Sequence, residues 1–325
     1  MTRLGYQIPN FTYPGEAGND IVGSVIAQAK AAEAAGFDRV FVMDHFYQLP
    51  GIGAHDEPMI EAYTLLAAIA QHTSKVRLSA LVTGNTYRNP TLLAKTITAL
   101  DHVSGGRATL GIGAGWFEQE HQSLGYEFGT FTDRFEKLEE ALQIIIPMLR
   151  GERVTFAGKH YQVNDAVNSP APLSRVPIMI GGSGEKKTLR MVAQYADESN
   201  LSSGPIDDIP RKLDVLAAHC ERLGRDRSEI KVTKLQMVCL APTMEEAEAD
   251  LRAIAAVKGF GDEVVELMKM ILIYGDPDTV GEKLLAAMNT GIDGLTINLA
   301  VNGHRTERIE LLGQVASKAI AESGR

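Results

Sequence analysis

The sequence is poor in cysteine, with Cys220 and Cys239 as the only two thiols among 325 residues. Two thiols cannot build a disulfide framework, and they do not supply the ligands of a zinc site by themselves. The scarcity argues against a small secreted domain held together by disulfides. We interpret both thiols as buried, unreactive side chains of a protein from a reducing cytoplasm.

Long apolar runs and positive charge are also scarce. No stretch approaches the roughly 18 apolar residues of a membrane span, and the N-terminus lacks the apolar segment of a signal peptide. The chain has 32 basic and 41 acidic side chains, a formal net charge of -9. Sequence-independent nucleic-acid binding depends on Lys and Arg that neutralise phosphates. We therefore expect a cytoplasmic protein with a small-molecule substrate and no nucleic-acid or membrane partner.

Hydrophobic residues make up 45% of the chain and charged residues 22%, which is typical of a globular protein. The length is ordinary for an α/β barrel with insertions. We find no low-complexity linker and no block of like charges, so we predict a single domain over residues 1–325. The segment from about 240 to 275 reads as an inserted helical excursion.

Short apolar segments alternate with segments of helical periodicity along most of the chain. Strands are expected at 4–8, 37–43, 75–82, 108–113, 176–180, 198–201, 230–240 and 295–299, with a hairpin at 154–163. Helices are expected at 21–35, 63–72, 89–102, 133–149, 187–195, 210–223, 243–259, 262–270, 277–288 and 305–321. The clearest helix is 133–149, for which Thr132 is the expected N-cap.

Eight strands that each precede a helix, apolar on both faces, indicate a parallel sheet covered on all sides. The count favours a closed (β/α)8 TIM barrel. The alternative is an open doubly wound sheet, but no Gly-rich dinucleotide fingerprint follows the first strand. In a barrel the active site lies at the C-terminal ends of the strands.

Several chemically distinctive residues follow these strand ends. Asp44 and His45 follow the second strand, and imidazole titrates near neutral pH, so His45 could exchange a proton with a bound molecule. The alternative to a catalytic role is that Asp44 only caps the start of the loop and that His45 is a solvated side chain. No second His stands at a strand end, and we predict no metal site.

The segment Gly181-Gly182-Ser183-Gly184 resembles an anion cradle at the start of a helix. Lys186, Lys187 and Arg190 add positive charge nearby, although they could also form a solvated face. The only tryptophan, Trp116, follows the glycines of the fourth strand. It could stack on a planar ring or simply pack a loop.

Together these residues resemble the bacterial-luciferase-like superfamily, and most closely its branch that uses coenzyme F-420 (8-hydroxy-5-deazaflavin, F420). The matching stretches are 5–7, 34–38, 44–46, 89–90, 100–101, 104–107, 110–115, 133–135, 181–182 and 196–197. They run along most of the chain in the order of the family. The resemblance implies a luciferase-like barrel and a hydride-transfer oxidoreductase.

The resemblance also implies site roles. A non-prolyl cis peptide at Ala80-Leu81 would back the cofactor ring, and His45 and Asp44 would face its reactive edge as catalytic residues. Residues expected to contact the cofactor are Gln7, Ala80, Leu81, Thr83, Asn85, Gly113, Gly115, Gly181, Gly182, Ser183 and Gly184. Residues expected to line the substrate pocket are Asn10, Trp116 and Asn200. Thr83 and Asn85 would flank the ring, and the lysines after the glycine loop could meet an acidic tail.

Three functions remain in view. The first is an F420-dependent oxidoreductase acting on an unidentified small organic substrate. The second is an FMN-dependent monooxygenase that takes reduced FMN from a partner reductase, and the third is a non-catalytic flavin-binding barrel. Relatives that oxidise a sugar phosphate carry a glutamate where this chain has Trp116, which disfavours that substrate. Relatives of this kind are usually homodimers, and we expect the same here.

Overall fold

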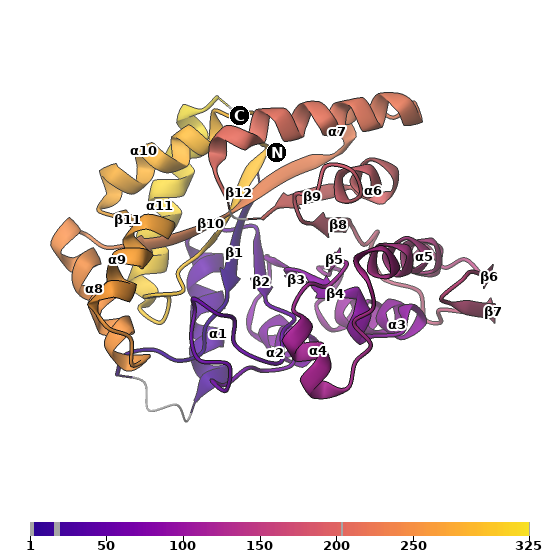
Figure 1. Ribbon diagram of the computed structural model, residues 1–325, viewed down its shortest axis with the longest axis horizontal. Helices are drawn as coiled ribbons and strands as arrows, with labels where there is room; N and C mark the ends of the chain where they lie inside the picture. Colours follow the sequence, from indigo (N-terminus) through magenta and orange to yellow (C-terminus); the bar gives the residue numbers. More distant parts are fainter. Residues whose placement is uncertain (1–2, 16–19, 203, 325) are drawn as a thin grey trace.

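The computed structural model describes residues 3–15, 20–202 and 204–324. Its centre is a ring of parallel strands surrounded by helices (Figure 1). The strands of the ring are β1 (Arg3–Ile8), β2 (Arg39–Val42), β3 (Arg77–Ala80), β4 (Thr83–Gly84), β5 (Leu110–Gly113), β8 (Ile178–Gly181), β9 (Glu198–Leu201), β10 (Lys231–Leu240) and β12 (Gly294–Asn298).

The ring closes between β3 and β5. The sheet order is β3-β2-β1-β12-β10-β9-β8-β5-β4, and a parallel bridge between Leu78 and Ala108 joins its two ends. β3 pairs with β2 and β4 pairs with β5, so β3 and β4 are two halves of one interrupted strand. Counted in this way the barrel has eight strands. The predicted TIM barrel is confirmed, and the open doubly wound sheet is excluded.

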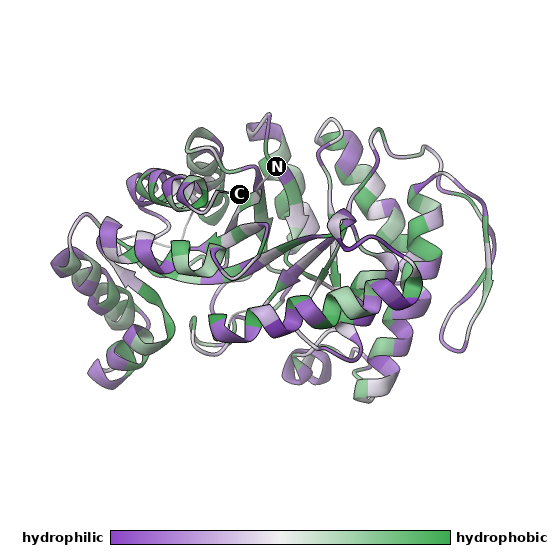
Figure 2. Cartoon of the chain, turned by 90° about the horizontal axis from the view of Figure 1, so that it is seen from above, coloured by the Kyte–Doolittle hydropathy of each residue, from purple (hydrophilic) through white to green (hydrophobic). Residues whose placement is uncertain are grey.

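Eight helices surround the ring, one after each strand. They are α1 (Ile21–Ala34), α2 (Ala62–His72), α3 (Pro90–Val103), α5 (Phe131–Leu149), α6 (Thr188–Tyr195), α7 (Ile209–Leu223), α10 (Pro277–Met288) and α11 (Thr306–Glu322). Their apolar faces turn toward the strands and their polar faces outward (Figure 2). In α5, for example, Leu138, Leu142 and Ile145 are buried at helical spacing.

The remaining elements lie in the connections. They are α4 (Glu118–Leu124), the hairpin β6 (Val154–Ala157) and β7 (Gln162–Ala166), α8 (Met244–Val257), α9 (Asp262–Ile271), β11 (Ile273–Gly275), and the 3-10 turns η1 (Asn85–Tyr87), η2 (Ile206–Asp208) and η3 (Arg227–Glu229). α8 and α9 pack on a small apolar cluster of their own that includes Leu251 and Val265. Both helices lie within the segment from about 240 to 275, and the prediction of a single domain with an inserted excursion there stays a prediction. Within the described ranges, no helix combines the length and apolarity needed to span a membrane.

Three local predictions need correction. Thr130, not Thr132, caps α5, because Thr130 and Asp133 form a reciprocal capping box one residue before Phe131. The helix α4 was not predicted. The non-prolyl cis peptide joins Leu81 and Val82 instead of Ala80 and Leu81. Leu81 still donates its N–H to Val42 in β2, so the strand changes partner only after Leu81.

Candidate active site

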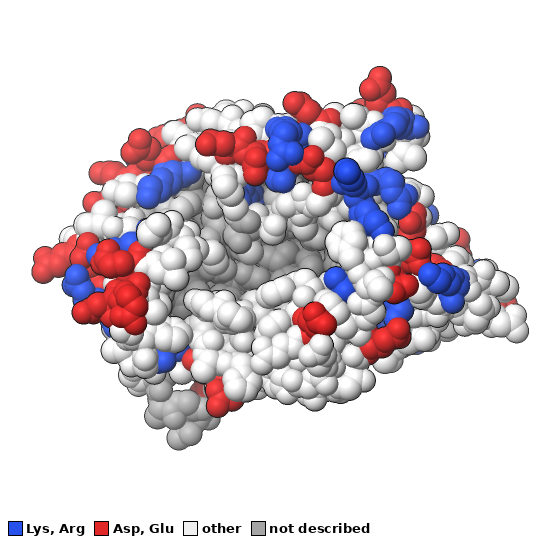
Figure 3. Space-filling model, viewed as in Figure 1, with Lys and Arg blue, Asp and Glu red and all other residues white. Residues whose placement is uncertain are grey.

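The C-terminal ends of the barrel strands open on one face of the molecule. That face is hollowed near its centre, in front of the strands (Figures 1 and 3). Lys and Arg side chains gather on the side of the hollow formed by α6 and α7. Most of the predicted site residues lie around this opening, which we call the barrel mouth.

His45 lies just beyond β2, with 13% of its side chain exposed. Its Nδ1 donates to Oε2 of Glu120, from α4, at 3.0 Å. This contact fixes Nδ1 as the protonated nitrogen whenever Glu120 is ionised. The structure shows no partner for Nε2 among the described residues. Nε2 is therefore the nitrogen of His45 that remains for a contact with a bound molecule.

Glu120 is fully buried and gathers hydrogen bonds from four groups. Besides His45, it accepts from the Tyr87 hydroxyl and from the backbone N–H groups of Phe46 and Tyr47. Burial alone would raise the pKa of Glu120, but these hydrogen bonds outweigh it and hold that pKa below its ordinary value. Glu120 therefore stays ionised at neutral pH and keeps the loop after β2 in place.

Asp44 has a different environment from its neighbour His45. Its carboxylate accepts from both terminal nitrogens of Arg88, at 2.6 and 2.9 Å, and from the N–H of Gly84 at 3.0 Å. Burial raises the pKa of Asp44, and the charge and hydrogen bonds of Arg88 oppose that rise. Arg88 also binds Glu61 at the start of α2. The carboxylate of Asp44 thus fastens β4 and η1 to the end of β2.

Glycines make room for the interruption between β3 and β4. A Cβ on Gly181 would lie 2.7 Å from Cγ1 of Val82, and one on Gly113 would lie 2.9 Å from its Cγ2. Real side chains do not approach so closely, so both positions require glycine. Val82 is wedged between β5 and β8. The two glycines that were predicted to contact a cofactor have at least this packing task.

A chain of amide side chains supports the same segment from inside the barrel. Asn298 donates to Oε1 of Gln7 at 2.9 Å, and Gln7 donates to the carbonyl of Leu81 at 3.3 Å. Both amides are buried. The Leu81-Val82 peptide is therefore supported by a chain of two hydrogen bonds that runs from β12 through β1 to the carbonyl of Leu81.

Thr83 and Asn85 were predicted to flank a cofactor ring. The Thr83 hydroxyl bonds to the Tyr63 hydroxyl of α2, and Asn85 is buried beside Tyr161 of the β6–β7 hairpin. The predicted contact of Thr83 and Asn85 with a cofactor ring stays a prediction.

The glycine loop lies between the end of β8 and the start of α6. Gly182 has a φ of +121°, a conformation that residues with side chains rarely adopt, and its N–H donates to Asn200. A Cβ on Gly184 would lie 3.0 Å from Oγ1 of Thr188. Ser183 bonds to Ser202 through their hydroxyls at 2.8 Å. The backbone of this loop can be approached closely, as a phosphate requires.

The basic residues after the loop are only partly available. Arg190 pairs with Glu139 at 2.6 Å, and the Lys187 ammonium lies over the rings of Phe131 and Phe135. Lys186 is exposed. Of the three cations named from the sequence, Lys186 is the one for which the described structure shows neither an ion pair nor a ring contact.

Trp116 lies at the rim of the barrel mouth, and 61% of it is exposed. It stacks on Phe117 with a centroid distance of 5.2 Å and meets His45 edge-on at 5.8 Å. The conformation of Gly115 just before it has a φ of +79°. Trp116 is therefore placed beside the imidazole with much of its indole open to solvent.

The predicted pocket residues Asn10 and Asn200 are both buried and fully engaged at their amide nitrogens. Asn10 donates to Thr12 and Ala300 and accepts from Lys258 of the α8 end at 2.9 Å. Asn200 donates to Thr233 and Thr296 inside the barrel. In this structure both amides order the walls around the barrel mouth.

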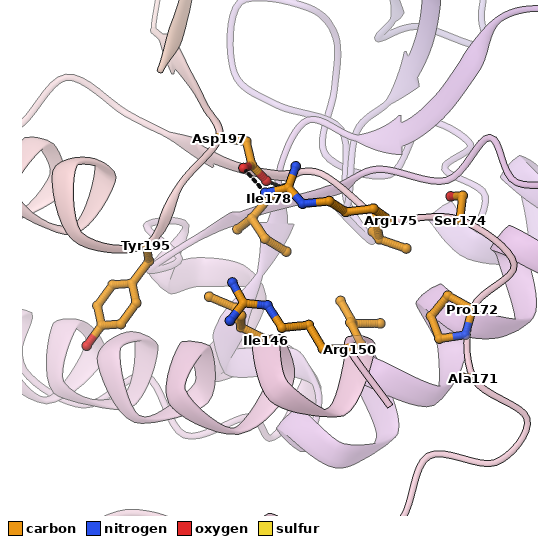
Figure 4. Close-up of a pocket in the computed structure, with 11 residues that line it drawn as sticks. Ile146, Arg150, Ala171, Pro172, Ser174, Arg175, Ile178, Tyr195 and Asp197 are labelled. Carbon is orange, nitrogen blue, oxygen red and sulfur yellow. Dashed lines mark hydrogen bonds and ion pairs between the residues drawn. The ribbon is translucent and has the colours of Figure 1, made fainter. Parts of the chain in front are cut away.

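A second cavity, of about 300 Å³, opens at the other end of the barrel (Figure 4). Arg150 and Arg175 lie along it, and Arg175 pairs with Asp197 at 2.5 Å. The C-terminal ends of α5 and α6 meet here, so their dipoles oppose an anion. Chemistry in such barrels sits at the opposite ends of the strands. We do not assign the active site to this cavity.

The prediction of no metal site stays a prediction. Asp133 and Glu136 of α5 and His160 of the hairpin bring ligand atoms within 4.8 Å of one another. The ammonium of Lys159 lies 2.8 Å from Glu136 and 3.6 Å from Asp133. A side-chain cation thus already neutralises part of the negative charge of this cluster.

Sequence reasoning missed Glu120, Tyr87 and Arg88 as parts of the site. Tyr87 and Arg88 immediately precede the Asn89-Pro90 helix start, and nothing in their spacing marks them. Glu120 is one of two glutamates close behind Trp116, the other being the exposed Glu118. A prediction of α4 as a helix at the barrel mouth would have indicated Glu120 as a site residue.

Comparison with known proteins agrees with this geometry. Residues 2–263 match the model of the luciferase-like monooxygenase family. Over 202 residues the chain is 33% identical to an F420-dependent glucose-6-phosphate dehydrogenase of Microbacterium testaceum, covering 61% of this chain and 59% of that protein. The corresponding enzyme of Nakamurella multipartita is 29% identical over 86% of this chain and 87% of its own length.

An FMNH(2)-dependent dimethylsulfone monooxygenase of Pseudomonas fluorescens is 26% identical, over 88% of this chain and 84% of that protein. Among solved structures, an F420-dependent secondary alcohol dehydrogenase in complex with an F420-acetone adduct is similar. It has a TM-score of 0.78 and 22% identity, and the match covers 98% of this chain and 99% of that one. At this identity the likeness establishes the shared barrel.

Proposed function

The chain belongs to the luciferase-like monooxygenase family, and from that premise we propose that it is an F420-dependent oxidoreductase. It transfers hydride between the deazaflavin and a small organic substrate. The observation that carries the proposal is the pair of His45 and Glu120 at the barrel mouth, with a glycine loop on the same rim. The F420-dependent relatives support the deazaflavin as the cofactor.

The residues present fit such a cofactor. Gly182 and Gly184 carry no side chains, so a phosphate group can approach the loop backbone closely. The Leu81-Val82 segment, propped by Gln7, offers a firm wall for a planar ring. When bound, the deazaflavin supplies a ring carbon that gives or accepts hydride.

In this proposal His45 is the catalytic residue. Its Nε2 exchanges a proton with the substrate oxygen while the hydride is transferred, because an alcohol and the corresponding carbonyl compound differ by one proton and one hydride. Glu120 is a positioning residue that holds the ring and its tautomer. Asp44 was first considered catalytic, and its contacts with Arg88 and Gly84 support a positioning role instead.

The substrate of this chain differs in kind from a sugar phosphate. Trp116 and Phe117 form an aromatic pair beside His45, at the place where a sugar-phosphate-oxidising relative would carry an acid. An exposed indole favours an apolar or planar partner. We propose a small organic alcohol or carbonyl compound with an apolar body.

A parallel fluorescence titration with F420 and with FMN tests the cofactor. Tight binding of F420 and at least about tenfold weaker binding of FMN, a difference of roughly 1.4 kcal/mol, is expected. The reverse preference would make the chain an FMN-dependent monooxygenase, the function that the dimethylsulfone relative supports. Binding without turnover of any alcohol or carbonyl compound would favour a non-catalytic flavin-binding barrel.

We further propose that the chain forms a homodimer in the cytoplasm, as first expected from the family resemblance. Sedimentation of the purified chain against its monomer mass of 35.2 kDa tests the assembly. A single species of that mass would contradict the dimer without bearing on the cofactor.

A further inference from the structure

Lys234 is a buried cation next to the glycine loop. It lies on β10, and only 1% of the residue is exposed. Its ammonium donates to the carbonyl of Ser202, at the end of β9, at 3.1 Å. Among the described residues no carboxylate oxygen lies within 4.0 Å of this ammonium. A charge removed from water and left without an opposite charge is costly, so its presence calls for a reason.

One hydrogen-bond step separates Lys234 from the loop. The N–H of Ser202 donates to the hydroxyl of Ser183 at 3.1 Å, and the two hydroxyls are 2.8 Å apart. From the other side, Lys212 of α7 points its ammonium at the carbonyl of Ser183, 3.4 Å away. Two lysines therefore converge beneath the segment between Gly182 and α6.

The surrounding charges leave Lys234 uncompensated. Glu185 pairs with Arg211 and lies 3.8 Å from Lys212, so its charge is already shared between two cations. Burial, and then the positive charge of Lys212, lower the pKa of Lys234. The net local charge is positive in a chain whose total charge is -9. An anion bound at the loop would offset both the burial of the Lys234 charge and its repulsion from Lys212.

We propose that Lys234 and Lys212 are the charged part of an anion site that holds a phosphate group on the backbone of Ser183 and Gly184. The N–H groups before α6 provide the hydrogen bonds, and the two lysines provide the positive field from below. This inference rests on the phosphate-loop part of the proposed function. It moves the decisive charge from Lys186 and Lys187, the lysines noticed in the sequence, to residues further along the chain.

The probe is inorganic phosphate, added to the purified, cofactor-free full chain. Thermal unfolding is followed with phosphate and with chloride at equal ionic strength. Phosphate at about ten times its Kd should raise the Tm of the wild type by on the order of 2 °C, because it binds only the folded state. The variant Lys234→Met should lose most of this rise. Methionine keeps the length of the side chain, and it removes the desolvation cost of a buried charge that has no carboxylate partner.

Lys186→Met is the matched control, since Lys186 is exposed on the same loop. It should keep the phosphate effect. If Lys234→Met does not fold, Lys212→Met takes its place and should weaken phosphate affinity by about threefold or more. Retention of the full phosphate effect in Lys234→Met, or no effect in the wild type, would overturn the inference.

The outcome is separable from that of the cofactor titration. Both F420 and FMN carry a phosphate, so an FMN-binding protein would still show the phosphate effect if the inference holds. Phosphate stabilisation that depends on Lys234, together with no F420 binding, would support the anion site and refute the deazaflavin proposal.

Discussion

At the scale of single residues, the contact between Glu120 and His45 makes a sharp prediction. Glu120→Gln keeps the shape of the side chain but replaces the ionised acceptor with a neutral amide, so the Nδ1-protonated tautomer loses its support. We expect kcat to fall roughly tenfold to a hundredfold, with little change in cofactor Kd. Steady-state kinetics and a fluorescence titration measure the two quantities.

A purely structural role for Glu120 must be distinguished from a positioning role. The ¹⁵N shifts of the His45 imidazole report its tautomer directly, and they should change in Glu120→Gln. Glu118→Gln is the control, because Glu118 is exposed two residues away on the same helix. Unchanged imidazole shifts combined with a lowered kcat would rule out control of the tautomer.

His45→Ala should abolish the proton exchange and lower turnover by about 10²–10⁴. Cofactor affinity should stay within a few-fold, since the proposed cofactor contacts come from the glycine loop and the β3–β4 segment. Turnover equal to the wild type in this variant would remove His45 from the mechanism.

The sequence predicted which residues follow the barrel strands better than it predicted the directions of their side chains. Asp44 and His45 were found because they follow an apolar strand, yet adjacent residues point in different directions, one to Arg88 and the other to Glu120. Partners such as Lys234 for Ser202 depend on tertiary contacts 32 positions apart. No local pattern contains that information.

At the scale of elements, the turn between α2 and β3 depends on one carboxylate. Glu33 of α1 accepts from the backbone N–H groups of Ser74, Lys75 and Val76, at 2.6 to 3.1 Å. Its partial burial would raise the pKa of Glu33, but these hydrogen bonds lower it. The carboxylate thus ties the first helix to the start of the third strand.

The sign of the pH dependence follows. Because the folded state lowers the pKa of Glu33, its stabilisation is complete above the unfolded value and is lost as pH falls through the folded one. Glu33→Gln should cost about 1–2 kcal/mol near neutral pH. The difference in Tm from the wild type should shrink below about pH 4. A constant difference from pH 7 to pH 3 would contradict this account.

Long elements were predicted well and short ones poorly. The periodicity of 133–149 identified α5, but α4 has seven residues, most of them polar, so no apolar stripe marks it. The interruption between β3 and β4 leaves an apolar run intact, and the sequence read it as one strand. Short, functional deviations of this kind are set by contacts with Gly113 and Gly181, which lie far along the chain.

At the scale of the whole molecule, barrel closure was predictable from the count of strand-helix units. Which end of the barrel carries the site and which contributes mainly to stability was less predictable from the sequence. Arg39 and Glu198 begin β2 and β9, and their side chains meet inside the barrel with only 3% and 2% exposed. The pair lies at the end away from the barrel mouth. We therefore expect it to affect stability and not cofactor binding.

The corresponding prediction uses both partners. Glu198→Gln removes the buried carboxylate of Arg39 and leaves its guanidinium only the part-exposed Asp38, 3.3 Å away, so it should destabilise the fold by up to about 3–5 kcal/mol. Arg39→Met combined with Glu198→Met removes both charges and should cost less than Glu198→Gln alone.

The apparent Tm measures stability, and an F420 titration at temperatures below the unfolding range measures cofactor binding at the site. The two ends act independently only if Glu198→Gln lowers the Tm at unchanged cofactor Kd, while Glu120→Gln lowers kcat with a much smaller change in Tm. A loss of cofactor affinity in folded Glu198→Gln would show that the ends of the barrel are coupled through its polar interior.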